Sequence, residues 1–458
     1  MSFEKICPWT GFVTNRYFFA ESELIEDSLK SLNLGFLSWK NLSVQERQHY
    51  LQVALQRLQQ KKQSLSQLIT TEMGKPISQS IAEVEKCIQS FQFFLQKDLS
   101  FLHSKKITIG SVDHHLKTEP LGIIYSIMPW NFPLWQVIRM VVPALLAGNT
   151  ILLKHSEVTP QIGIEIESLF ANIFEHLVLK NLLISHNLTE AVISDARVGG
   201  VSLTGSTKAG MVIAQIAAQY LKKSVLELGG SDAYIVSADA NLQLAAQQIT
   251  QSRLQNTGQS CIAAKRCLVE RSVQDELMDL LKAEYQNYQY GPVEQAQTTL
   301  GPLAHPRLKK AYLEQRREFL AATKAQLIQS VACDFATAES AYVDAEIYYI
   351  SQNSVWLKSQ EFFAPLLVVM PYQSVEEAVA LANSTDYGLG AGVWSQDIDW
   401  AQKIADQLNV GQVAVNSFIK SDAQIPFGGM KKSGWGRELG EQGFCEFTQT
   451  RVISTMLK

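Results

Sequence analysis

The chain has 458 residues, of which 46% are hydrophobic and 18% are charged, and its formal net charge is −4 at pH 7. This length predicts about three domain-sized units, and the composition is typical of a soluble globular enzyme. The small negative charge, with Lys and Arg scattered along the chain, excludes nucleic acid and anionic membranes as partners. No apolar stretch reaches the ~20 residues of a membrane span and the first residues do not form a secretory signal, so we expect a cytoplasmic protein.

The first part of the chain combines helices with a short hairpin. Apolar residues recur every three or four positions from Ser43 to about Lys97, and Gly74–Pro76 divides this pattern into two helices. From Lys106 to Pro120 apolar and polar residues alternate on both sides of a Gly-Ser turn, which predicts two extended segments.

From Gly122 onward, predicted strands alternate with predicted helices. Such alternation indicates two α/β domains with largely parallel sheets, which bind ligands at the carboxyl ends of their strands. The first domain would contain strands 122–130, 149–155, 198–206 and 223–230 and helices 131–148 and 207–222. The second would contain strands 232–236, 267–270, 366–372, 390–395 and 411–417 and helices 241–255 and 375–383.

The tail, residues 446–457, has the pattern of one exposed strand. A lone strand needs a partner edge for its backbone hydrogen bonds. We expect it to pair with the 106–120 hairpin of another subunit, by addition of a strand to an open sheet edge.

The six cysteines are spread over the whole chain and form no CxxC pair. This spacing predicts neither a metal site nor a disulfide. Cys261, in the stretch QNTGQSCIAAKR, then has two readings. A lone cysteine is usually an inert core residue, whereas small neighbours and the nearby cations Lys265 and Arg266 favour a reactive thiolate.

Two predicted strand ends carry side chains suited to a nucleotide. In SLTGSTKAG a glycine turn at Gly205 and Ser206 precedes a helix, whose free amide groups favour a pyrophosphate. In LLKHSE the side chains of Lys154 and Glu157 end a strand where a ribose would lie. A tight turn and a solvated strand end are the ordinary readings, and both stay open at this point.

Two further polar residues suit acyl chemistry. Glu227, in VLELGGSD, lies in a buried strand before a Gly-Gly turn. Burial suits a carboxyl group to general-base chemistry by raising its pKa, and a structural salt bridge is the equal alternative. Asn131, in IMPWNFPLWQ, is placed to donate to an oxyanion or to cap the following helix, and locally the pattern favours the cap.

Together these motifs resemble the aldehyde dehydrogenase superfamily over nearly the full length, from about Asn15 to the tail. The spacing from Glu227 to Cys261 is specific to that family. Within it, the chain is most similar to the bacterial NAD(P)-dependent succinate-semialdehyde dehydrogenases. The matching motifs, in the order of the family, are IMPWNFP, LLKHSE, LTGS, ELGGSDAYIV, QNTGQSC, SQEFFAP and IPFGGMKKSGWGREL.

The resemblance implies an α/β aldehyde dehydrogenase fold. It has a Rossmann-like parallel-sheet cofactor domain, here residues 1–101 and 121–228, and a second α/β catalytic domain, residues 229–440. A small β oligomerisation element would comprise residues 102–120 and 441–458. A homodimer or homotetramer that acts on a small-molecule aldehyde is therefore expected.

The resemblance also implies a mechanism. Cys261 would be the nucleophile that attacks the aldehyde carbon, and the Asn131 side chain and the Cys261 backbone N–H would hold the oxyanion. After hydride transfer to the cofactor leaves a thioester, Glu227 would activate water for hydrolysis. No metal takes part.

The cofactor implied is NAD or NADP. Because Glu157 would accept a hydrogen bond from a free 2′-hydroxyl and repel a 2′-phosphate, we expect NAD to be preferred, although Lys154 and Ser156 are compatible with a phosphate. The implied cofactor-binding residues are Trp130, Lys154, Ser156, Glu157, Gly205, Ser206, Leu228, Glu361 and Phe363.

The resemblance implies a semialdehyde substrate, and we expect succinic semialdehyde. Its carboxylate would be held by Arg139 and Ser421. A second arginine expected in such enzymes is replaced here by Gln255, and an ordinary helix-surface ion pair is nearly as good a reading of Arg139. Gln360 and Ala364 replace the usual Glu and Gly around Glu361, which predicts a stiffer or shifted loop.

Three alternatives stay open. Another small aliphatic aldehyde is compatible with the same motifs. A CoA-acylating dehydrogenase is disfavoured by the presence of Glu227, and a binding protein that has lost catalysis is disfavoured by Cys261, Glu227 and Asn131 together.

Overall fold

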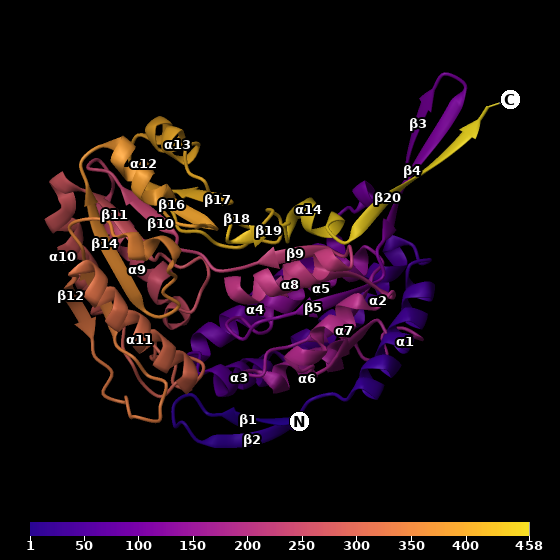
Figure 1. Cartoon of the computed structure of the whole chain (residues 1–458), viewed down its shortest axis with the longest axis horizontal. Helices are drawn as coiled ribbons and strands as arrows, with labels where there is room; N and C mark the ends of the chain where they lie inside the picture. The colour runs from indigo at the N-terminus through magenta and orange to yellow at the C-terminus, as the bar shows by residue number, and fades with distance from the viewer. Residues whose placement is uncertain (458) are drawn as a thin grey trace.

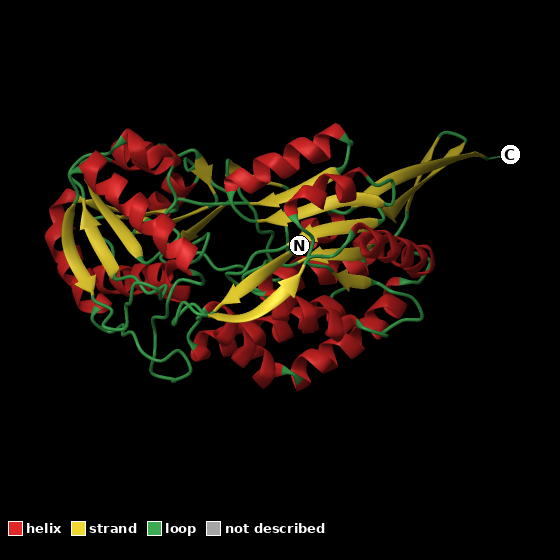
Figure 2. Cartoon of the chain, turned by 60° about the horizontal axis from the view of Figure 1, so that its bottom comes forward, coloured by secondary structure: helices red, strands yellow, loops and turns green. Residues whose placement is uncertain are grey.

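Two α/β units, each built on its own sheet, lie side by side in the computed structural model, and a narrow arm projects from one of them (Figures 1 and 2). The structure describes residues 1–457, so Lys458, the last residue of the expected oligomerisation element, lies outside the described residues. Among residues 1–457 no helix combines the length and apolar character that crossing a membrane would need.

The first unit is a six-stranded sheet with the order β19-β9-β8-β5-β6-β7. All neighbouring strands are parallel except β19, which runs antiparallel to β9 at the edge. Its strands are β5 (Ile123–Ile127), β6 (Thr150–Lys154), β7 (Leu179–Asn181), β8 (Val198–Thr204), β9 (Lys223–Glu227) and β19 (Gly434–Trp435). The helices in this part of the chain are α1 (Ser22–Trp39), α2 (Val44–Gln60), α3 (Lys62–Met73), α4 (Ile77–Gln96), α5 (Trp135–Leu146), α6 (Pro160–Phe170), α7 (Thr189–Ser194) and α8 (Thr207–Gln219).

The second unit is a seven-stranded sheet with the order β12-β13-β14-β11-β10-β16-β17. It is parallel apart from the edge pair β12 and β13. Its strands are β10 (Ala233–Val236), β11 (Arg266–Glu270), β12 (Gln326–Val331), β13 (Ala345–Tyr349), β14 (Leu366–Tyr372), β16 (Gly390–Trp394) and β17 (Gln412–Val415). The helices are α9 (Leu242–Leu254), α10 (Gln274–Tyr285), α11 (Pro306–Thr323), α12 (Val375–Asn383) and α13 (Ile398–Ala405).

Smaller elements connect these units. A hairpin of β1 (Ser2–Ile6) and β2 (Val13–Phe18) lies below both in Figure 1, and β15 (Tyr387–Gly388) pairs with β18 (Met430–Lys431). After β17 the chain crosses back over the first unit through β18, β19 and α14 (Gly440–Cys445), the yellow segment in Figure 1.

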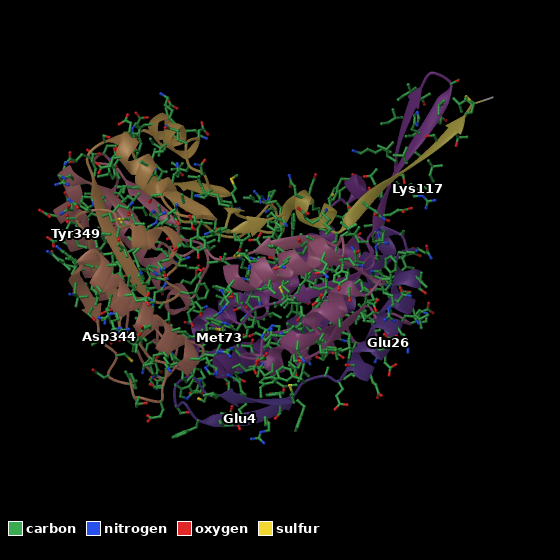
Figure 3. The ribbon with its side chains drawn as sticks, in the orientation of Figure 1. Glu4, Glu26, Met73, Lys117, Asp344 and Tyr349 are labelled. Carbon is green, nitrogen blue, oxygen red and sulfur yellow. The ribbon has the colours of Figure 1, made fainter. Side chains whose placement is uncertain are left out.

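The arm is a three-stranded antiparallel sheet of β3 (Lys105–Ile109), β4 (Val112–Pro120) and β20 (Thr448–Met456). Figure 3 labels Lys117 on this arm, where the side chains stand clear of the rest of the chain. The strand β20 pairs with β4 of its own chain, so the expectation that it pairs with the hairpin of another subunit is wrong. The physical reason is that β4 has a second edge free, and α14 brings the following residues directly beside it.

The predicted fold class is confirmed, with two largely parallel α/β units and a small β element. One helical pattern was divided incorrectly, because the segment before Gly74 contains two helices that meet at Lys61. The Nζ of Lys61 donates to Glu165 on α6 at 2.7 Å. Apolar periodicity did not reveal the break, since both helices bury the same kind of face against the first unit.

Candidate active site

A cavity of about 610 Å³ contains Cys261 in its wall and lies between α4, α5, the turn before β11 and the segment after β17. Both units contribute to it: Trp135 comes from α5, whereas Phe418 and Phe427 come from the segment after β17. This volume is within the range of sites for small molecules. The cavity is therefore the candidate active site.

The turn that carries Cys261 has an unusual backbone. Asn256, Thr257 and Gly258 have φ values of 53°, 52° and 76°, a region in which each non-glycine residue costs about 1–3 kcal/mol. Side-chain hydrogen bonds hold this conformation. Asn256 Nδ2 donates to the carbonyl of Asn131 at 2.7 Å, and the Thr257 hydroxyl donates to the carbonyl of Gly301 at 3.1 Å. The turn is thus fixed before the chain reaches the thiol.

Burial controls the chemistry of the Cys261 thiol. It raises the pKa of Cys261 to about 12, although Lys265 and Arg139 act to lower that pKa. The ammonium of Lys265 donates to two backbone carbonyls of the turn, and the guanidinium of Arg266 donates to the carbonyl of Ser231 at 2.8 Å. The expectation that these cations stabilise a thiolate does not describe the resting protein, because burial outweighs them.

Asn131 lies against the same turn. Its Nδ2 donates to the carbonyl of Gln259 at 3.1 Å. The helix α5 begins four residues later, and its first N–H groups, those of Leu134 and Trp135, donate to Glu83 on α4 at 3.0 Å. The local prediction of an Asn131 cap is therefore wrong, because a carboxylate from another helix takes that role and leaves Asn131 beside the cysteine turn.

Glu227 ends β9 with a carboxyl group that is buried and has no hydrogen-bond partner among residues 1–457. Burial raises its pKa well above the usual value, the carboxylate of Glu438 raises it further, and Arg139 opposes both. Arg139 forms its ion pair with Glu438, so the salt-bridge alternative for Glu227 is not realised. The carboxyl group packs against Gly428, next to the cavity residue Phe427, and its charge acts to raise the pKa of Cys261.

The expected ribose-binding residues lie at the carboxyl end of β6. Lys154 is buried, and burial lowers its pKa while Glu157 opposes that shift. The hydroxyl of Ser156 accepts from the backbone N–H of Val158 at 3.2 Å. One carboxyl oxygen of half-buried Glu157 lies 3.7 Å from Nε2 of His186. Lys154 and Glu157 are thus brought together, as a cation and an anion at one strand end.

The expected pyrophosphate turn lies at the end of β8. The N–H of Gly205 donates to the carbonyl of Glu227 at 2.9 Å, and Ser206 caps α8 by accepting from the N–H of Ala209 at 3.2 Å. Leu228 is buried after β9, where its side chain packs against Gly210. The turn therefore places a capped helix start beside the strand that carries Glu227.

Glu361 and Phe363 approach from the second unit. One oxygen of Glu361 accepts from the N–H of Gly230 at 2.9 Å and lies 3.6 Å from Lys265 Nζ. The ring of Phe363 packs edge-on against that of Trp130, with 5.7 Å between centroids. Ala364 is buried with its φ outside the left-handed region, so the loss of glycine there strains no backbone.

The strand ends of the first unit fit a dinucleotide. The buried hydroxyl of Thr204, the last residue of β8, has no hydrogen-bond partner among residues 1–457. With the buried cation of Lys154 and the free N–H groups at the start of α8, it offers a polar partner for phosphate and ribose oxygens. These are the groups that would hold NAD(P), which supplies a hydride acceptor when bound.

The expected substrate residues Arg139, Gln255 and Ser421 all line the cavity. Arg139 is buried in its pair with Glu438, whereas Gln255 is exposed at the end of α9. The hydroxyl of Ser421 accepts from two donors, Lys86 Nζ at 2.7 Å and Trp135 Nε1 at 3.1 Å. Arg139 does form an ion pair, as the alternative interpretation expected, but this pair is buried and does not lie on a helix surface.

Sequence reasoning missed three charged residues of this site: Lys86, Glu83 and Glu438. Glu438 lies in the quoted stretch IPFGGMKKSGWGREL, so a signal for it was present. Lys86 and Glu83 gave no such signal. The helical pattern predicts α4, but it does not show that the inner face of α4 lines a cavity, because the opposite wall lies more than 300 positions away in the sequence.

Residues 1–453 match the model of the aldehyde dehydrogenase family. The chain belongs to the aldehyde dehydrogenase family. A protein of Synechocystis sp. named probable succinate-semialdehyde dehydrogenase (NADP+) is 37% identical over 455 residues, which are 99% of each chain. A succinate-semialdehyde dehydrogenase (NADP+) of Deinococcus radiodurans is 35% identical over 98% of this chain and 94% of its own length. The crystal structure of succinic semialdehyde dehydrogenase from Streptococcus pyogenes with NADP+ superposes with a TM-score of 0.93, at 31% identity over 98% of this chain and 99% of that one.

The predicted enzyme class is thereby confirmed. This aldehyde dehydrogenase is an oxidoreductase that converts an aldehyde into the carboxylic acid with NAD(P) as the hydride acceptor. Of the three residues that the family resemblance singled out, Cys261 lies in the cavity wall and Asn131 donates to the turn that carries it. Glu227 packs against Gly428, next to Phe427 of the wall.

Proposed function

We propose that the aldehyde dehydrogenase oxidises succinic semialdehyde to succinate, with Cys261 as the nucleophile. The thiol of Cys261 gives its proton to water and its sulfur adds to the aldehyde carbon, whose oxygen becomes an oxyanion. NAD(P), when bound, would supply the acceptor for the hydride whose loss converts this adduct into a thioester. Water then cleaves the thioester and releases the acid. The observation that carries this proposal is a thiol in the cavity wall, that of Cys261, together with an unpaired buried carboxyl group, that of Glu227, which packs against Gly428 beside the wall residue Phe427.

Asn131 and the Cys261 backbone N–H are proposed to hold the oxyanion. The amide of Asn131 has two N–H bonds, and one of them donates to the carbonyl of Gln259 at 3.1 Å. The amide is therefore fixed in orientation while its second N–H stays available. One oxyanion donor contributes about 3–4 kcal/mol of transition-state stabilisation in comparable acyl-transfer sites.

Glu227 is proposed as the general base for thioester hydrolysis. Its raised pKa makes the carboxylate a stronger base once the proton has left. The raised pKa favours the protonated form of the resting carboxyl group, which carries no charge. Loss of that proton before hydrolysis is therefore a required step.

Succinic semialdehyde is the proposed substrate because the relatives named above from Synechocystis and Deinococcus radiodurans are called succinate-semialdehyde dehydrogenases. The cavity supports this choice, since it holds cationic side chains such as Lys86 that suit a substrate with one carboxylate. A different small aliphatic aldehyde is the second candidate.

NAD is the proposed preferred cofactor. The carboxylate of Glu157, at the end of β6, supports it because a carboxylate accepts from a 2′-hydroxyl and repels a 2′-phosphate. The names of the relatives point instead to NADP, and Lys154 and Ser156 suit a phosphate. The ratio of kcat/KM for NAD and NADP tests the proposal, and Glu157→Ser should move this ratio toward NADP.

We also propose a role for each part of the chain, from the family resemblance. Residues 1–101 and 121–228 would bind the cofactor, 229–440 would supply the nucleophile, and 102–120 with 441–458 would join subunits. The positions of Lys154 and Gly205 on the first sheet and of Cys261 before β11 support this division.

A single assay tests the reaction: formation of NAD(P)H from succinic semialdehyde, with and without CoA. We expect turnover that does not need CoA and that vanishes in Cys261→Ala, because no other thiol lines the cavity among the residues described. For Glu227→Gln we expect a first-turnover burst followed by slow steady turnover.

Persistent turnover in Cys261→Ala would contradict the nucleophile assignment. A requirement for CoA would favour the acylating alternative, in which a thiol replaces water, and loss of the burst in Glu227→Gln would mean that Glu227 acts before hydride transfer.

A further inference from the structure

Among residues 1–457, two lysines that line the cavity form no ion pair, Lys86 and Lys420, and Lys86 is the more buried of the two. Lys86, on the inner face of α4, donates from Nζ to the hydroxyl of Ser421 at 2.7 Å and lies 4.4 Å from the centre of the Trp135 ring. Both contacts are with neutral groups. Cation–π and hydroxyl contacts stabilise an ammonium only partly when it has left bulk water.

The carboxylates around Lys86 are engaged elsewhere. On α4, Glu83 pairs with Lys75 and also accepts from the N–H groups at the start of α5, while Glu85 pairs with Lys62 at 2.5 Å. On the opposite segment, Asp422 accepts from a backbone N–H at 2.8 Å. The charge of Lys86 is thus left for a group that enters the cavity.

Arg139, the other strong cation of the cavity wall, differs in this respect. It is buried and paired with Glu438, and its charge opposes protonation of Lys86. Gln255 carries no charge. Lys420 also lines the cavity, but it is exposed and its Nζ lies 4.4 Å from the centre of the Phe418 ring. Lys86 is therefore the cation best placed to balance an incoming anion inside the cavity.

The hydrogen bonds that Ser421 accepts fix the direction of its own hydroxyl proton. A serine hydroxyl has one O–H donor and two acceptor lone pairs. Two donors, Lys86 Nζ and Trp135 Nε1, converge on this oxygen at 2.7 Å and 3.1 Å and occupy the lone pairs. The hydroxyl proton must then point to an acceptor, and none is present among residues 1–457.

We propose that Lys86 and Ser421 form the subsite that binds the carboxylate of the aldehyde substrate. The remaining N–H bonds of the ammonium and the hydroxyl proton converge from α4 and from the segment after β17 on one anionic group. The inference rests on the proposed function and deepens it, since it assigns substrate charge selection to Lys86 and not to the neutralised Arg139.

The environment of Lys86 supports this assignment. Burial lowers its pKa to about 8, the charge of Arg139 lowers it as well, and Cys87, Asp422 and Glu83 oppose the shift. A carboxylate that binds beside Lys86 raises that pKa again, so binding and protonation favour each other. Above about pH 8 the free enzyme loses this cation, and KM for a carboxylated aldehyde should rise while KM for a neutral aldehyde stays constant.

The test compares succinic semialdehyde with butanal, which has the same chain length and no charge, in the full-length enzyme. Lys86→Met keeps most of the side-chain length and removes the charge. We expect KM for succinic semialdehyde to rise about 10- to 100-fold, the loss expected for hydrogen bonds to a charged group, and KM for butanal to change less than about threefold. Lys86→Arg, which keeps the charge, should lose less than Lys86→Met.

Lys310→Met, on the exposed surface of α11, removes the same charge far from the cavity and serves as the matched control. Equal losses for succinic semialdehyde and butanal in Lys86→Met would overturn the proposal, because they would indicate a structural role. An unchanged KM for succinic semialdehyde would overturn it as well.

A binding measurement separates this inference from the proposed reaction. Calorimetric titration of succinate into Cys261→Ala needs no turnover, and we expect its Kd to rise about 10- to 100-fold when Lys86→Met is added. A wild-type enzyme that fails to oxidise succinic semialdehyde while this difference persists would refute the reaction and keep the subsite. An unchanged Kd, or no binding of succinate at all, would refute the subsite.

Discussion

At the scale of single residues, the carboxyl groups of Glu227 and Glu438 and the guanidinium of Arg139 form one buried charge system. Arg139 pairs with Glu438, and burial raises the pKa of Glu227, which the charge of Glu438 raises further. The base for thioester hydrolysis is therefore tuned by a residue that is proposed to touch neither substrate nor cofactor. Glu438 is a positioning residue in this sense.

The pH dependence of turnover should report this coupling. Glu227 must be ionised to act as a base, and its raised pKa means that turnover falls as the pH drops through that value. Glu438→Gln removes the charge that raises the pKa and frees Arg139 to lower it, so the acid limb should move to lower pH. The pH profile of steady-state kcat measures this shift, with thermal unfolding as a check because an unpaired buried arginine destabilises a fold. A limb that stays in place in a folded variant would show that Glu438 does not set the pKa of Glu227.

The same residues show how much of the site could be predicted from the sequence. Cys261, Glu227 and Asn131 stand in motifs whose order and spacing resemble a family, so their assembly could be predicted without coordinates. Lys86 could not, because its importance depends on Ser421, which lies 335 positions away and closes the cavity from the second unit. Local sequence even misled for Asn131, since the cap of α5 comes from a different helix.

At the scale of elements, the turn before the nucleophile is the least ordinary part of the backbone. It combines positive φ values with close packing, since a Cβ built at Gly258 would lie 2.5 Å from the carbonyl carbon of Ala364. Because Ala364 belongs to the loop that carries Glu361, the turn and the loop can move only together. Glycine is required at this position on both grounds.

Two glycine substitutions separate these effects. Gly258→Ala meets both the positive φ and the backbone of Ala364, whereas Gly110→Ala has a φ of 59° and nothing within 4 Å of the new Cβ. We expect Gly110→Ala to lower the free energy of unfolding by about 1–2 kcal/mol. Gly258→Ala should lose more and should also reduce kcat by about 100-fold, as expected for a misplaced nucleophile. Denaturant unfolding and steady-state kinetics measure both, and equal effects of the two substitutions would show that packing at Ala364 is unimportant.

Most elements of both sheets follow from alternating strand and helix patterns, and those predictions place β5, β6, β8, β9, β10, β11, β14, β16 and β17 correctly. The edge strand β12 was missed, because its polar and partly exposed residues lack the apolar run of a central strand. The strand β13 is buried, but its sequence AEIYY places Glu346 within a short apolar run. The break at Lys61 was missed for a similar reason: periodicity reports which face is buried, not whether the helix axis bends.

At the scale of the whole molecule, the arm leaves two strand edges open, those of β3 and β20. All five residues of β3 are exposed, and the side chains of Ile107 and Ile109 are 47% and 65% exposed. An open edge with apolar side chains favours pairing with another strand. This supports the proposed homo-oligomer, with β3 as one element that meets a second copy.

Changing the charge of this edge tests the assembly. Replacing Ile107 and Ile109 with lysine places two cations on the open strand, and we expect the assembly to dissociate toward the 51.1 kDa single chain. Size-exclusion chromatography with light scattering gives the mass directly. Leu221→Lys, at a position that is 94% exposed on the loop after α8, is the control and should leave the mass unchanged. A β3 variant with the wild-type mass would place the contact elsewhere.

The path of the chain after β17 has a consequence for synthesis. Residues 418–427 form one wall of the cavity, β19 covers the edge strand β9, and Glu438 pairs with Arg139. All other parts of the site precede them and are translated earlier. A nascent chain that has reached the end of β17 therefore carries its cysteine without an enclosing wall. A premature stop codon shortly after β17 should yield a polypeptide with the nucleophile but without dehydrogenase activity.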